Sequence, residues 1–508
     1  MTLRFFQLVG ITGLEPATSR PPDVCATNCA KSRSLKLSTD VFVECGCKGT
    51  EFFRDYQIFP YFFCVFAKNF NYFGAIARLL HLFCIFASIM TTYQITGPKR
   101  LQTTVKLPAS KSISNRALII HALSGGTILP ENLSDCDDTE VIIQALKNMP
   151  EVINIKAAGT AMRFMTAFLA ATEHGEHVLT GTERMQHRPI KVLVDALRRL
   201  GADISYEGEE GFPPLRIKGS TLEGGELDVA GDISSQYISA LLMIGPVLKK
   251  GLTLRLNGEI ISRPYIDLTL WTMREFGADA EWISMDTIKV EPKPYAQRPY
   301  FIESDWSAAS YWYEMVALSD DPEAEVRLEG LMDGSKQGDS SVRYIFSLLG
   351  VKTIFASKTP GKPTTVTLTK SGHRVPRLEY DFVNVPDLTQ TFVCTCCAMN
   401  IPFHFTGLQT LEIKETNRIK ALKTELAKLG YYIEAINGCE LKWDGKKPQG
   451  SDLRAQTTID TYEDHRMALA FAPLGFKMPI CINNPQVVTK SYPHYWDDLK
   501  KAQFTIQE

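Results

Sequence analysis

A hydroxyl-rich segment with two basic residues lies at Leu107–Gly126, which reads LPASKSISNRALIIHALSGG. It contains Lys111 and Arg116, and no Asp or Glu occurs between residues 105 and 130. A serine before an apolar helix is often only an N-cap. Two cations in one acid-free turn, however, favour an anion that can accept charge-assisted hydrogen bonds. The segment therefore predicts an anion site at the start of a helix.

Polar or basic residues recur at the boundaries of other expected helices, where unpaired backbone N–H groups and the helix dipole favour anions. The candidates are Ser112 in the first segment, Gly159 and Thr160 in AGTAMR, Arg184 and Arg188 in the loop TERMQHRPI, Ser234, Ser235 and Gln236 in GDISSQ, Lys414, Glu415 and Arg418 in KETNRI, His465 and Arg466 in YEDHRM, and Lys490 in VTKSYP. A cap or a surface salt bridge explains any one of them. It does not explain cations at so many helix boundaries.

Two acids, Asp387 and Glu415, stand among these groups at positions suited to proton transfer. A pair of carboxylates in different surroundings can serve as one general base and one general acid. The pattern predicts multiply anionic small substrates and a reaction that moves protons.

The elements that must position these residues form a repeat. Six segments combine a short β-branched run, a polar turn and an apolar helix, and the last four are spaced by about 75 residues. Between them lie amphipathic helices followed by Gly201, Gly277, Gly350 and Gly430, which are expected left-handed caps. Alternating α/β segments always look somewhat repetitive, but here nearly every unit also opens its first helix with polar groups. We expect six α/β units whose helix starts converge on one cleft.

Composition limits the function classes. With 508 residues and 44% hydrophobic residues, the chain can bury more than one core. The formal net charge of -2 argues against a general nucleic-acid binder, which needs a large basic excess. Beyond Met90 only Cys394, Cys396 and Cys397 lie close together, without a second ligand pair for a metal. We expect buried thiols, no metal and a reducing, cytoplasmic location.

Residues 1–89 differ from the rest of the chain. They hold Cys25, Cys29, Cys45, Cys47, Cys64 and Cys84, together with many phenylalanines and no sustained periodicity. The apolar run Gly74–Met90 is interrupted by Arg78 and His81, and its clean part is shorter than the roughly 20 residues of a membrane span. A secretory signal would lie at the extreme N-terminus. The sequence favours a mis-assigned start, with Met90 opening the protein, over a disordered extension or a membrane anchor.

Seven segments together resemble those of the 5-enolpyruvylshikimate-3-phosphate (EPSP) synthase family, whose members are inhibited by glyphosate. They are SKSISNRA, AGTAMR, SSQ, SRPYIDLT, KETNRI, YEDHRMA and TKSYP, and they occur in the family's order from about Met90 to the C-terminus. Together they are far more specific than any one of them.

The resemblance implies an α/β fold of two similar domains, each made of three βαβαββ units around a pseudo-threefold axis, like an inside-out α/β barrel. It implies a discontinuous lower domain, residues 90–110 plus 304–508, and an upper domain, residues 111–303, with the active site in the cleft between them. It also implies transfer of the enolpyruvyl group of phosphoenolpyruvate to the 5-hydroxyl of shikimate 3-phosphate. The implied protein is a cytoplasmic monomer of the chorismate pathway, without metal, organic cofactor, nucleic acid or membrane partner.

The resemblance also implies roles by position. Shikimate 3-phosphate would bind Ser112, Arg116, Ser234, Ser235, Gln236, Ser262, Tyr265, Asp387 and Lys414. Phosphoenolpyruvate would bind Lys111, Gly159, Arg184, Arg418, Arg466 and Lys490, and Thr160 would be a further substrate-binding residue. Glu415 and Lys111 would protonate the methylene of phosphoenolpyruvate, and Asp387 would accept the proton of the attacking hydroxyl. His465 would lie beside them.

Three departures from the family pattern affect expected local geometry. Ala157 stands where the family commonly has Asn, Thr410 replaces a ligand asparagine, and the segment between Leu146 and Ala158 is short enough to lack one hairpin of the second unit. The closest rival is the related UDP-N-acetylglucosamine enolpyruvyl transferase, which carries a reactive cysteine that the TERMQHRP region lacks. A non-catalytic phosphate- or RNA-end-binding relative is disfavoured, because paired acids among the cations would repel a polyanion.

Overall fold

The computed structural model describes residues 91–357, 359, 361–446 and 457–508. The expectation for residues 1–89 therefore lies outside the described residues. Among the residues that are described, no helix combines the length and the hydropathy needed to cross a lipid bilayer.

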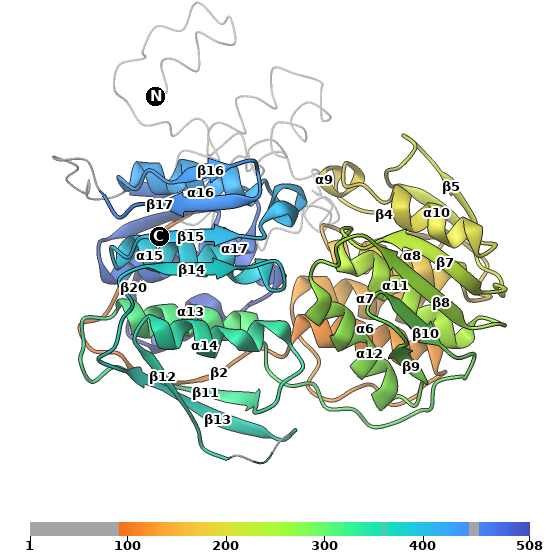
Figure 1. Cartoon of the computed structure of the whole chain (residues 1–508), viewed down its shortest axis with the longest axis horizontal. Helices are drawn as coiled ribbons and strands as arrows, with labels where there is room; N and C mark the ends of the chain where they lie inside the picture. Colours follow the sequence, from red (N-terminus) through yellow and green to blue (C-terminus); the bar gives the residue numbers. More distant parts are fainter. Residues whose placement is uncertain (1–90, 358, 360, 447–456) are drawn as a thin grey trace, which may run out of the picture. The chain divides into compact units, whose positions relative to one another are not determined.

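The buried apolar side chains fall into two clusters. One cluster contains residues between Ala109 and Ile302, and we call this part the inserted lobe. The other contains Tyr93–Leu107 and residues from Trp306 to Phe504, and we call this part the terminal lobe. Figure 1 shows the inserted lobe in orange to green and the terminal lobe mainly in green to blue. The terminal lobe is therefore made of two separate stretches of the chain, and the inserted lobe lies between them in the sequence.

The terminal lobe contains three four-stranded sheets in the orders β12-β13-β11-β2, β14-β15-β17-β16 and β18-β19-β1-β20. Their strands are β1 (Thr92–Thr96), β2 (Gln102–Lys106), β11 (Glu325–Met332), β12 (Val351–Phe355), β13 (Pro363–Lys370), β14 (Leu378–Asp381), β15 (Phe403–Thr406), β16 (Glu434–Ile436), β17 (Glu440–Trp443), β18 (Thr457–Ile459), β19 (Ile480–Asn483) and β20 (Thr505–Gln507). Its α-helices are α13 (Trp306–Leu318), α14 (Val342–Leu348), α15 (Thr389–Ala398), α16 (Arg418–Lys428), α17 (His465–Phe471) and α18 (Tyr495–Lys501).

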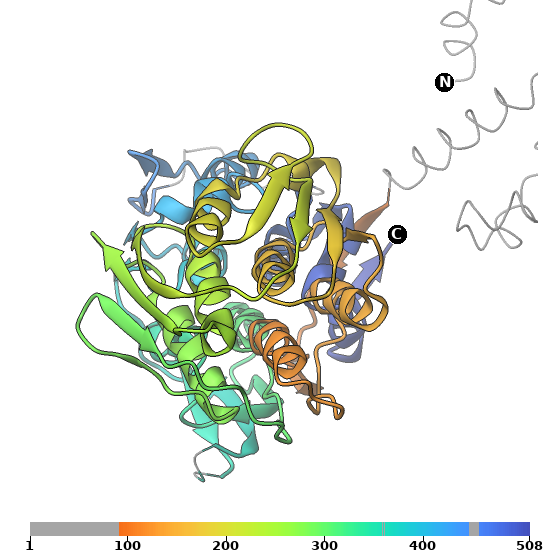
Figure 2. The ribbon, with the colours of Figure 1, turned by 90° about the vertical axis from the view of Figure 1, so that its right-hand side faces the viewer.

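The inserted lobe contains two four-stranded sheets, β3-β4-β6-β5 and β7-β8-β10-β9. Their strands are β3 (Val152–Asn154), β4 (Glu176–Thr180), β5 (Asp203–Tyr206), β6 (Leu215–Lys218), β7 (Gly225–Ala230), β8 (Leu252–Asn257), β9 (Ala280–Trp282) and β10 (Thr287–Val290). Its helices are α6 (Lys111–Leu123), α7 (Asp137–Asn148), α8 (Gly159–Ala170), α9 (Glu183–Gln186), α10 (Lys191–Arg199), α11 (Ser235–Ile244) and α12 (Arg263–Glu275). Figure 2 looks onto this lobe and shows helices nearly end-on with strands outside them.

All five sheets share one pairing pattern, which confirms the repeat expected from the sequence. In each sheet one edge pair is parallel and the other two pairs are antiparallel. In four of the sheets one α-helix links the parallel strands, as α8 links β3 to β4 and α11 links β7 to β8. Between the parallel strands β2 and β11 lie the inserted lobe and α13. The expected caps Gly201, Gly277, Gly350 and Gly430 have positive φ angles. Helices α8, α11 and α13 are buried nearly all round, in keeping with their mostly apolar sequences.

The unit of α6 and α7 differs from the others, because the described residues contain no four-stranded sheet for it. Helix α7 ends at its C-cap Met149, and only Pro150 and Glu151 precede β3. Two residues cannot supply the missing hairpin. The fold is therefore the expected two-part α/β architecture, with one unit reduced to its helices.

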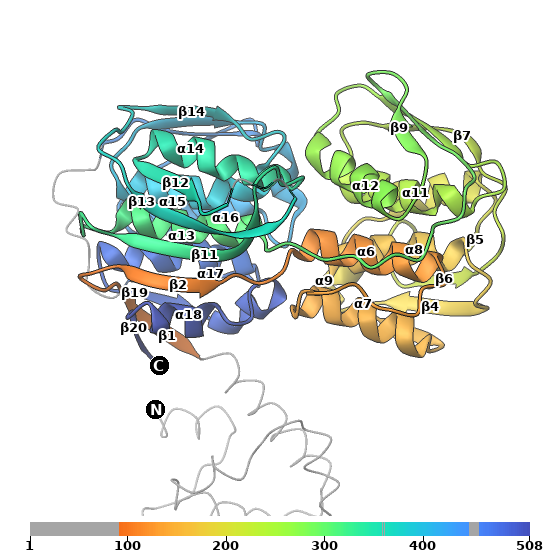
Figure 3. The same ribbon diagram turned by 90° about the horizontal axis from the view of Figure 1, so that it is seen from below.

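Two chain segments cross between the lobes and pair with each other (Figure 3). Ala109 forms a β-bridge with Ser304, the Ser110 N–H donates to the Glu303 carbonyl at 2.8 Å, and the Asp305 N–H donates to Pro108 at 2.9 Å. This paired crossing leads directly into α6 on one side and α13 on the other. The starts of those two helices are consequently held next to each other.

Candidate active site

A polar pocket lies where helix starts from both lobes meet. Among the described residues it is lined by Lys111, Ser112, Arg116, Asp138, Gly159, Thr160, Arg188, Ser234, Ser235, Gln236, Ser262, Tyr265, Asp305, Ser307, Ala308, Tyr311, Asp387, Lys414, Glu415, Arg418, His465, Arg466, Ser491 and Tyr492. The lining contains six Lys and Arg residues and four Asp and Glu residues. Of the predicted site residues, only Arg184 and Lys490 are absent from it. The excess of cations suits a small anionic ligand.

The start of α6 provides the first two cations. Ser110 caps the helix, and the Lys111 ammonium lies 3.2 Å from Asp138 on α7. Burial alone would lower the pKa of Lys111, but Asp138 and other nearby acidic groups outweigh it and raise the pKa. Lys111 is therefore a charged ammonium at neutral pH.

Arg116 lies one turn deeper on the same helix and is almost fully buried. Its guanidinium donates to Thr269 Oγ1 at 2.7 Å, to the Ser112 carbonyl at 2.8 Å and to Ser239 Oγ at 3.1 Å. These partners are neutral, and burial lowers the pKa of Arg116 to about 10. A positive charge held only by neutral oxygens attracts an anion to the pocket.

Gly159, at the start of α8, allows an arginine to approach the backbone. A Cβ atom at this position would lie 2.4 Å from Nη1 of Arg188. The next residue, Pro189, is fixed because its carbonyl accepts from Arg163 at 3.0 Å and from Tyr237 at 2.5 Å. Arg188 thereby points into the pocket. Arg188 was noted in the sequence as one of two arginines in the loop that ends at Pro189, but it was not predicted to bind a substrate.

The structure places Arg184 outside the lining. It lies on the short helix α9 and donates to the Tyr462 carbonyl at 3.0 Å and to Glu463 at 3.3 Å. The Glu463 side chain is largely exposed, and that of Arg184 is partly exposed. Only three residues lie between Arg184 and Arg188, and α9 together with the loop after it directs only Arg188 toward the pocket.

The remaining contacts of the inserted lobe come from α11 and α12. Ser234 caps α11, and the Gln236 side chain donates to Thr160 Oγ1 at 3.2 Å. Ser262 precedes α12 with φ of 54°, and its N–H donates to the Val383 carbonyl of the other lobe at 3.0 Å. The hydroxyl and amide groups of two helix starts are thus brought together.

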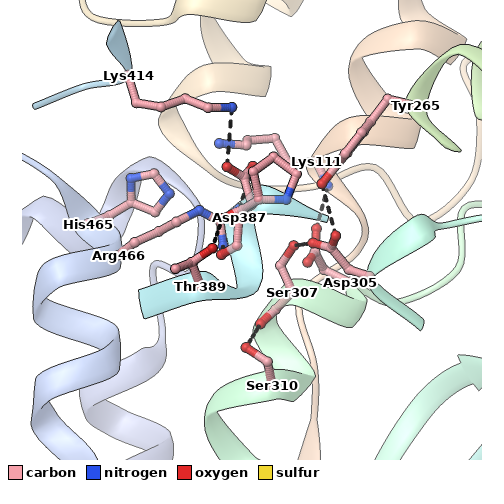
Figure 4. A network of polar contacts seen from close by, with 12 residues as sticks. Lys111, Tyr265, Asp305, Ser307, Ser310, Asp387, Thr389, Lys414, His465 and Arg466 are labelled. Atoms are coloured by element: carbon pink, nitrogen blue, oxygen red, sulfur yellow. Dashed lines mark hydrogen bonds and ion pairs between the residues drawn. The ribbon is translucent and has the colours of Figure 1, made fainter. Parts of the chain in front are cut away.

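Asp387 is the centre of an ion-pair cluster in the terminal lobe (Figure 4). Its carboxylate lies 2.9 Å from Arg418, 3.1 Å from Arg466 and 3.3 Å from Lys414. Burial would raise the pKa of Asp387, but the three cations outweigh it and lower the pKa well below the usual range. Asp387 is therefore an ionised carboxylate that can accept a proton.

Glu415 is held in the same way from two sides. Its carboxylate lies 2.9 Å from Arg418 and 3.2 Å from Lys490. Burial is again outweighed, and Lys490, Arg418 and Arg188 lower the pKa of Glu415 well below its usual range. Lys490 also donates to the Ala157 carbonyl at 3.1 Å, so it links the lobes. Ala157 thus contributes its backbone carbonyl to the site, whereas its methyl side chain cannot form the hydrogen bonds of the asparagine that the family commonly has at this position.

Arg418 joins the two acids to a third. It is buried, and it donates to Asp464 at 2.7 Å as well as to Asp387 and Glu415. Asp464 in turn caps α17 through the Arg466 N–H at 2.9 Å. One guanidinium therefore fixes three carboxylates from three elements.

His465 lies at the start of α17 and is buried. Burial and the nearby Lys111 lower its pKa well below the usual value, so the imidazole is neutral. In the described part of the chain, neither of its ring nitrogens has a hydrogen-bond partner. The side-chain oxygen of Thr410 is likewise buried without a partner there.

No group of three or more His, Cys, Asp or Glu side chains is arranged to hold a metal ion in residues 91–357, 359, 361–446 and 457–508. Cys394, Cys396 and Cys397 are buried on α15, as predicted. The pocket offers charged donors, two ionised carboxylates and a neutral imidazole. The charged donors can bind the phosphate and carboxylate groups of a substrate. The two carboxylates and the imidazole can exchange protons with that substrate.

The acid cluster leads to a prediction about stability. Because the pKa values of Asp387 and Glu415 are depressed in the folded protein, their contribution is complete above their unfolded values, about 3.9 and 4.3. It is lost as the pH falls below those values. We expect the free energy of unfolding, measured with denaturant, to fall steeply below about pH 4.5. The Asp387→Asn variant should show a shallower slope in this window, whereas an equal slope would contradict the assignment.

Comparisons with known proteins agree on one family. The profile of the family described as EPSP synthase (3-phosphoshikimate 1-carboxyvinyltransferase) matches residues 95–153 and 148–499. A 3-phosphoshikimate 1-carboxyvinyltransferase of Bacteroides fragilis is 58% identical over 418 residues, covering 82% of this chain and 98% of the relative. One from a Marinomonas species is 33% identical over 421 residues, covering 77% and 95%. The structure of EPSP synthase from Acinetobacter baumannii superimposes with a TM-score of 0.66 at 20% identity, covering 82% of this chain and all of that one.

Proposed function

The chain belongs to the EPSP synthase family, and we propose that the polar pocket between its lobes is the active site. The protein is a transferase that moves the enolpyruvyl group of phosphoenolpyruvate to the 5-hydroxyl of shikimate 3-phosphate and releases phosphate. The observation that carries the assignment of the site is the convergence of Lys111, Arg188 and Arg466 around two ionised acids. The proposals below concern which residue does what.

Shikimate 3-phosphate binds mainly to helix starts of the inserted lobe in this proposal. Its ligands are Ser112, Arg116, Ser234, Ser235, Gln236, Ser262, Tyr265, Asp387 and Lys414. Arg116 supports this, because its partners are neutral and leave its charge available to a phosphate. The hydroxyls and the remaining free N–H groups at the starts of α11 and α12 add neutral donors.

Phosphoenolpyruvate binds beside it, between the two lobes. Its proposed ligands are Lys111, Gly159, Thr160, Arg188, Arg418, Arg466 and Lys490. The family resemblance implied Arg184 as a ligand of phosphoenolpyruvate. In this proposal Arg188 has that role instead, because Arg188 packs against Gly159 and lines the pocket. Two anionic substrates side by side require this density of cations.

The chemistry is an addition followed by an elimination. Glu415, assisted by Lys111, carries the proton that adds to the methylene carbon of phosphoenolpyruvate, while Asp387 accepts the proton of the attacking 5-hydroxyl. In the elimination, the Glu415 carboxylate takes a proton back from the methyl group of the tetrahedral intermediate while the C–O bond to phosphate breaks. Phosphate leaves with the proton that Asp387 accepted, which gives the enol ether and returns both residues to their starting states. The cations stabilise the intermediate.

Glu415 must become protonated to act as an acid, although its ion pairs now hold its pKa low. The carboxylate and phosphate of phosphoenolpyruvate bring negative charge to Lys490 and Arg418. Sharing those cations weakens their hold on Glu415 and adds like charge nearby, so its pKa rises on binding. The neutral His465 beside it contributes no opposing charge.

Purified full-length chain tests the reaction directly. Incubation with phosphoenolpyruvate and shikimate 3-phosphate is expected to give one product, heavier than shikimate 3-phosphate by one enolpyruvyl group, detected by mass spectrometry. Replacing the acceptor by UDP-N-acetylglucosamine is expected to give none. Transfer to the UDP-sugar instead would overturn the proposed acceptor.

Arg188 and Arg184 form a matched pair for testing the phosphoenolpyruvate site. We expect Arg188→Ala to raise the KM for phosphoenolpyruvate about 10- to 100-fold, since it removes charged hydrogen bonds. Arg184→Ala removes an exposed pair and should change the KM by less than about threefold. Steady-state phosphate release gives both values. The reverse ranking would return the role to Arg184.

We also propose that the lobes act as two domains, residues 111–303 and residues 90–110 with 304–508, which close on the substrates. Closure would exclude water from the charged pocket. The proposed protein is a cytoplasmic monomer that uses only small-molecule substrates, and its near-neutral net charge argues against a nucleic-acid partner. Light scattering with and without both substrates would measure the mass and the compaction; a stable dimer would contradict the proposal.

A further inference from the structure

Asp339 is a buried acid directly behind the pocket. It lies in the 3-10 helix Gly338–Ser341 of the terminal lobe, is 3% exposed and is not part of the pocket lining in the described residues. Its Oδ1 accepts a hydrogen bond from the Tyr265 hydroxyl at 2.9 Å, and its Oδ2 accepts one from the Ser307 hydroxyl. Both hydroxyl residues line the pocket.

The two hydroxyls come from opposite sides of the pocket. Tyr265 lies in the first turn of α12 in the inserted lobe, and Ser307 lies in the first turn of α13 in the terminal lobe. Figure 4 shows the two side chains approaching the same point. One carboxylate thus holds a pocket hydroxyl from each lobe.

The chain around Asp339 is itself fixed at the lobe crossing. Gln337 accepts from Ser110 Oγ at 3.0 Å and donates to the Ser304 carbonyl at 2.9 Å. A Cβ atom on Gly338 would lie 2.7 Å from Pro264, the residue before Tyr265. This close approach requires glycine and brings Asp339 within reach of the Tyr265 hydroxyl.

We propose that Asp339 is a positioning residue that fixes the Tyr265 and Ser307 hydroxyls for binding of shikimate 3-phosphate. The inference rests on the proposed role of Tyr265 in that site. Burial raises the pKa of Tyr265 well above its usual value, so its hydroxyl keeps the proton that Asp339 accepts. Without this acceptor, the phenol and the two helix starts lose their common anchor, and the substrate must order them on binding.

A double-mutant cycle tests the inference. We expect Asp339→Ala to raise the KM for shikimate 3-phosphate about tenfold, with kcat changed by less than about threefold, since one charged acceptor is lost. In a Tyr265→Phe background the same substitution should raise the KM by less than about threefold, because its main partner is already gone. Asp339→Asn should restore part of the affinity.

Asp333→Ala is the matched control. Asp333 lies in the same connecting segment but pairs with Arg343 at 3.0 Å, and the KM should stay at the wild-type value. An unchanged KM in Asp339→Ala, or effects that multiply independently in the cycle, would overturn the inference. No effect of Tyr265→Phe alone would instead reject the proposed substrate role of Tyr265. Where Asp339→Ala loses its thermal unfolding transition, Asp339→Asn replaces it in the cycle, with a smaller expected rise in the KM for shikimate 3-phosphate. No rise, or an equal rise in the wild-type and Tyr265→Phe backgrounds, would then overturn the inference.

Discussion

The Glu415→Gln variant is expected to lose about 10²- to 10⁴-fold in kcat, the usual contribution of a positioned acid or base. Glutamine keeps the size of the side chain but cannot carry a proton to the methylene carbon. The KM for phosphoenolpyruvate should stay level or fall, because a negative charge leaves a site built for anions. The measurement is steady-state phosphate release together with incorporation of solvent deuterium into the methylene group of the product.

Glu412→Gln is the control for this result. Glu412 is an exposed acid three residues upstream, in the 3-10 helix Gln409–Ile413, and its substitution should leave both rates unchanged. If Glu415→Gln kept kcat within about threefold of the wild type, with normal deuterium incorporation, Glu415 would not be the proton carrier.

Of the variants proposed for this protein, Arg418→Met is expected to lose the most stability, about 3–5 kcal/mol in the free energy of unfolding. The guanidinium is 1% exposed and pairs with Asp387, Glu415 and Asp464. Methionine replaces the volume but leaves three buried acids without their shared cation. Denaturant titration at neutral pH measures the loss, and activity should fall with it because both proposed acid–base groups lose their positions.

Arg327→Met provides the comparison for Arg418→Met. Arg327 forms an exposed pair with Glu325 on β11, and its loss should cost no more than about 1 kcal/mol. Equal losses in the two variants would mean that the network around Arg418 does not stabilise the site.

Much of the fold was predictable because the helix and strand boundaries of each unit are determined by short local sequence patterns. The polar helix starts and the glycine caps depend on neighbouring residues, and they were found where the sequence placed them. The short chain between Leu146 and Ala158 was expected to remove one hairpin from the second unit. The structure has no hairpin there, but the second unit keeps its sheet β3-β4-β6-β5, and the sheet that the described residues lack belongs to the unit of α6 and α7. Local rules therefore predicted the architecture, but not which unit is irregular.

The ion pairs of the pocket were not predictable in the same way. The turn around Lys111 has no acid in sequence, yet Asp138 reaches it from the next helix. Asp464 was visible as a helix start, but its bond to Arg418 joins residues 46 positions apart. Such pairs depend on how units pack, which residue types and spacing do not specify.

The sequence could not distinguish Arg184 from Arg188 for a related reason. Both residues are arginines in one loop, and only the turn of α9 and the space left by Gly159 separate their directions. Asp339 was not singled out at all, because an acid in a connecting segment resembles a solvated charge until its partners are known.

Phosphate release from phosphoenolpyruvate by the full-length chain, with and without shikimate 3-phosphate, tests the central claim most directly. The account predicts release that depends strictly on shikimate 3-phosphate and disappears in a folded Lys111→Ala variant. Release that persists in Lys111→Ala, or that proceeds without shikimate 3-phosphate, would contradict the assignment of this pocket as the site of enolpyruvyl transfer.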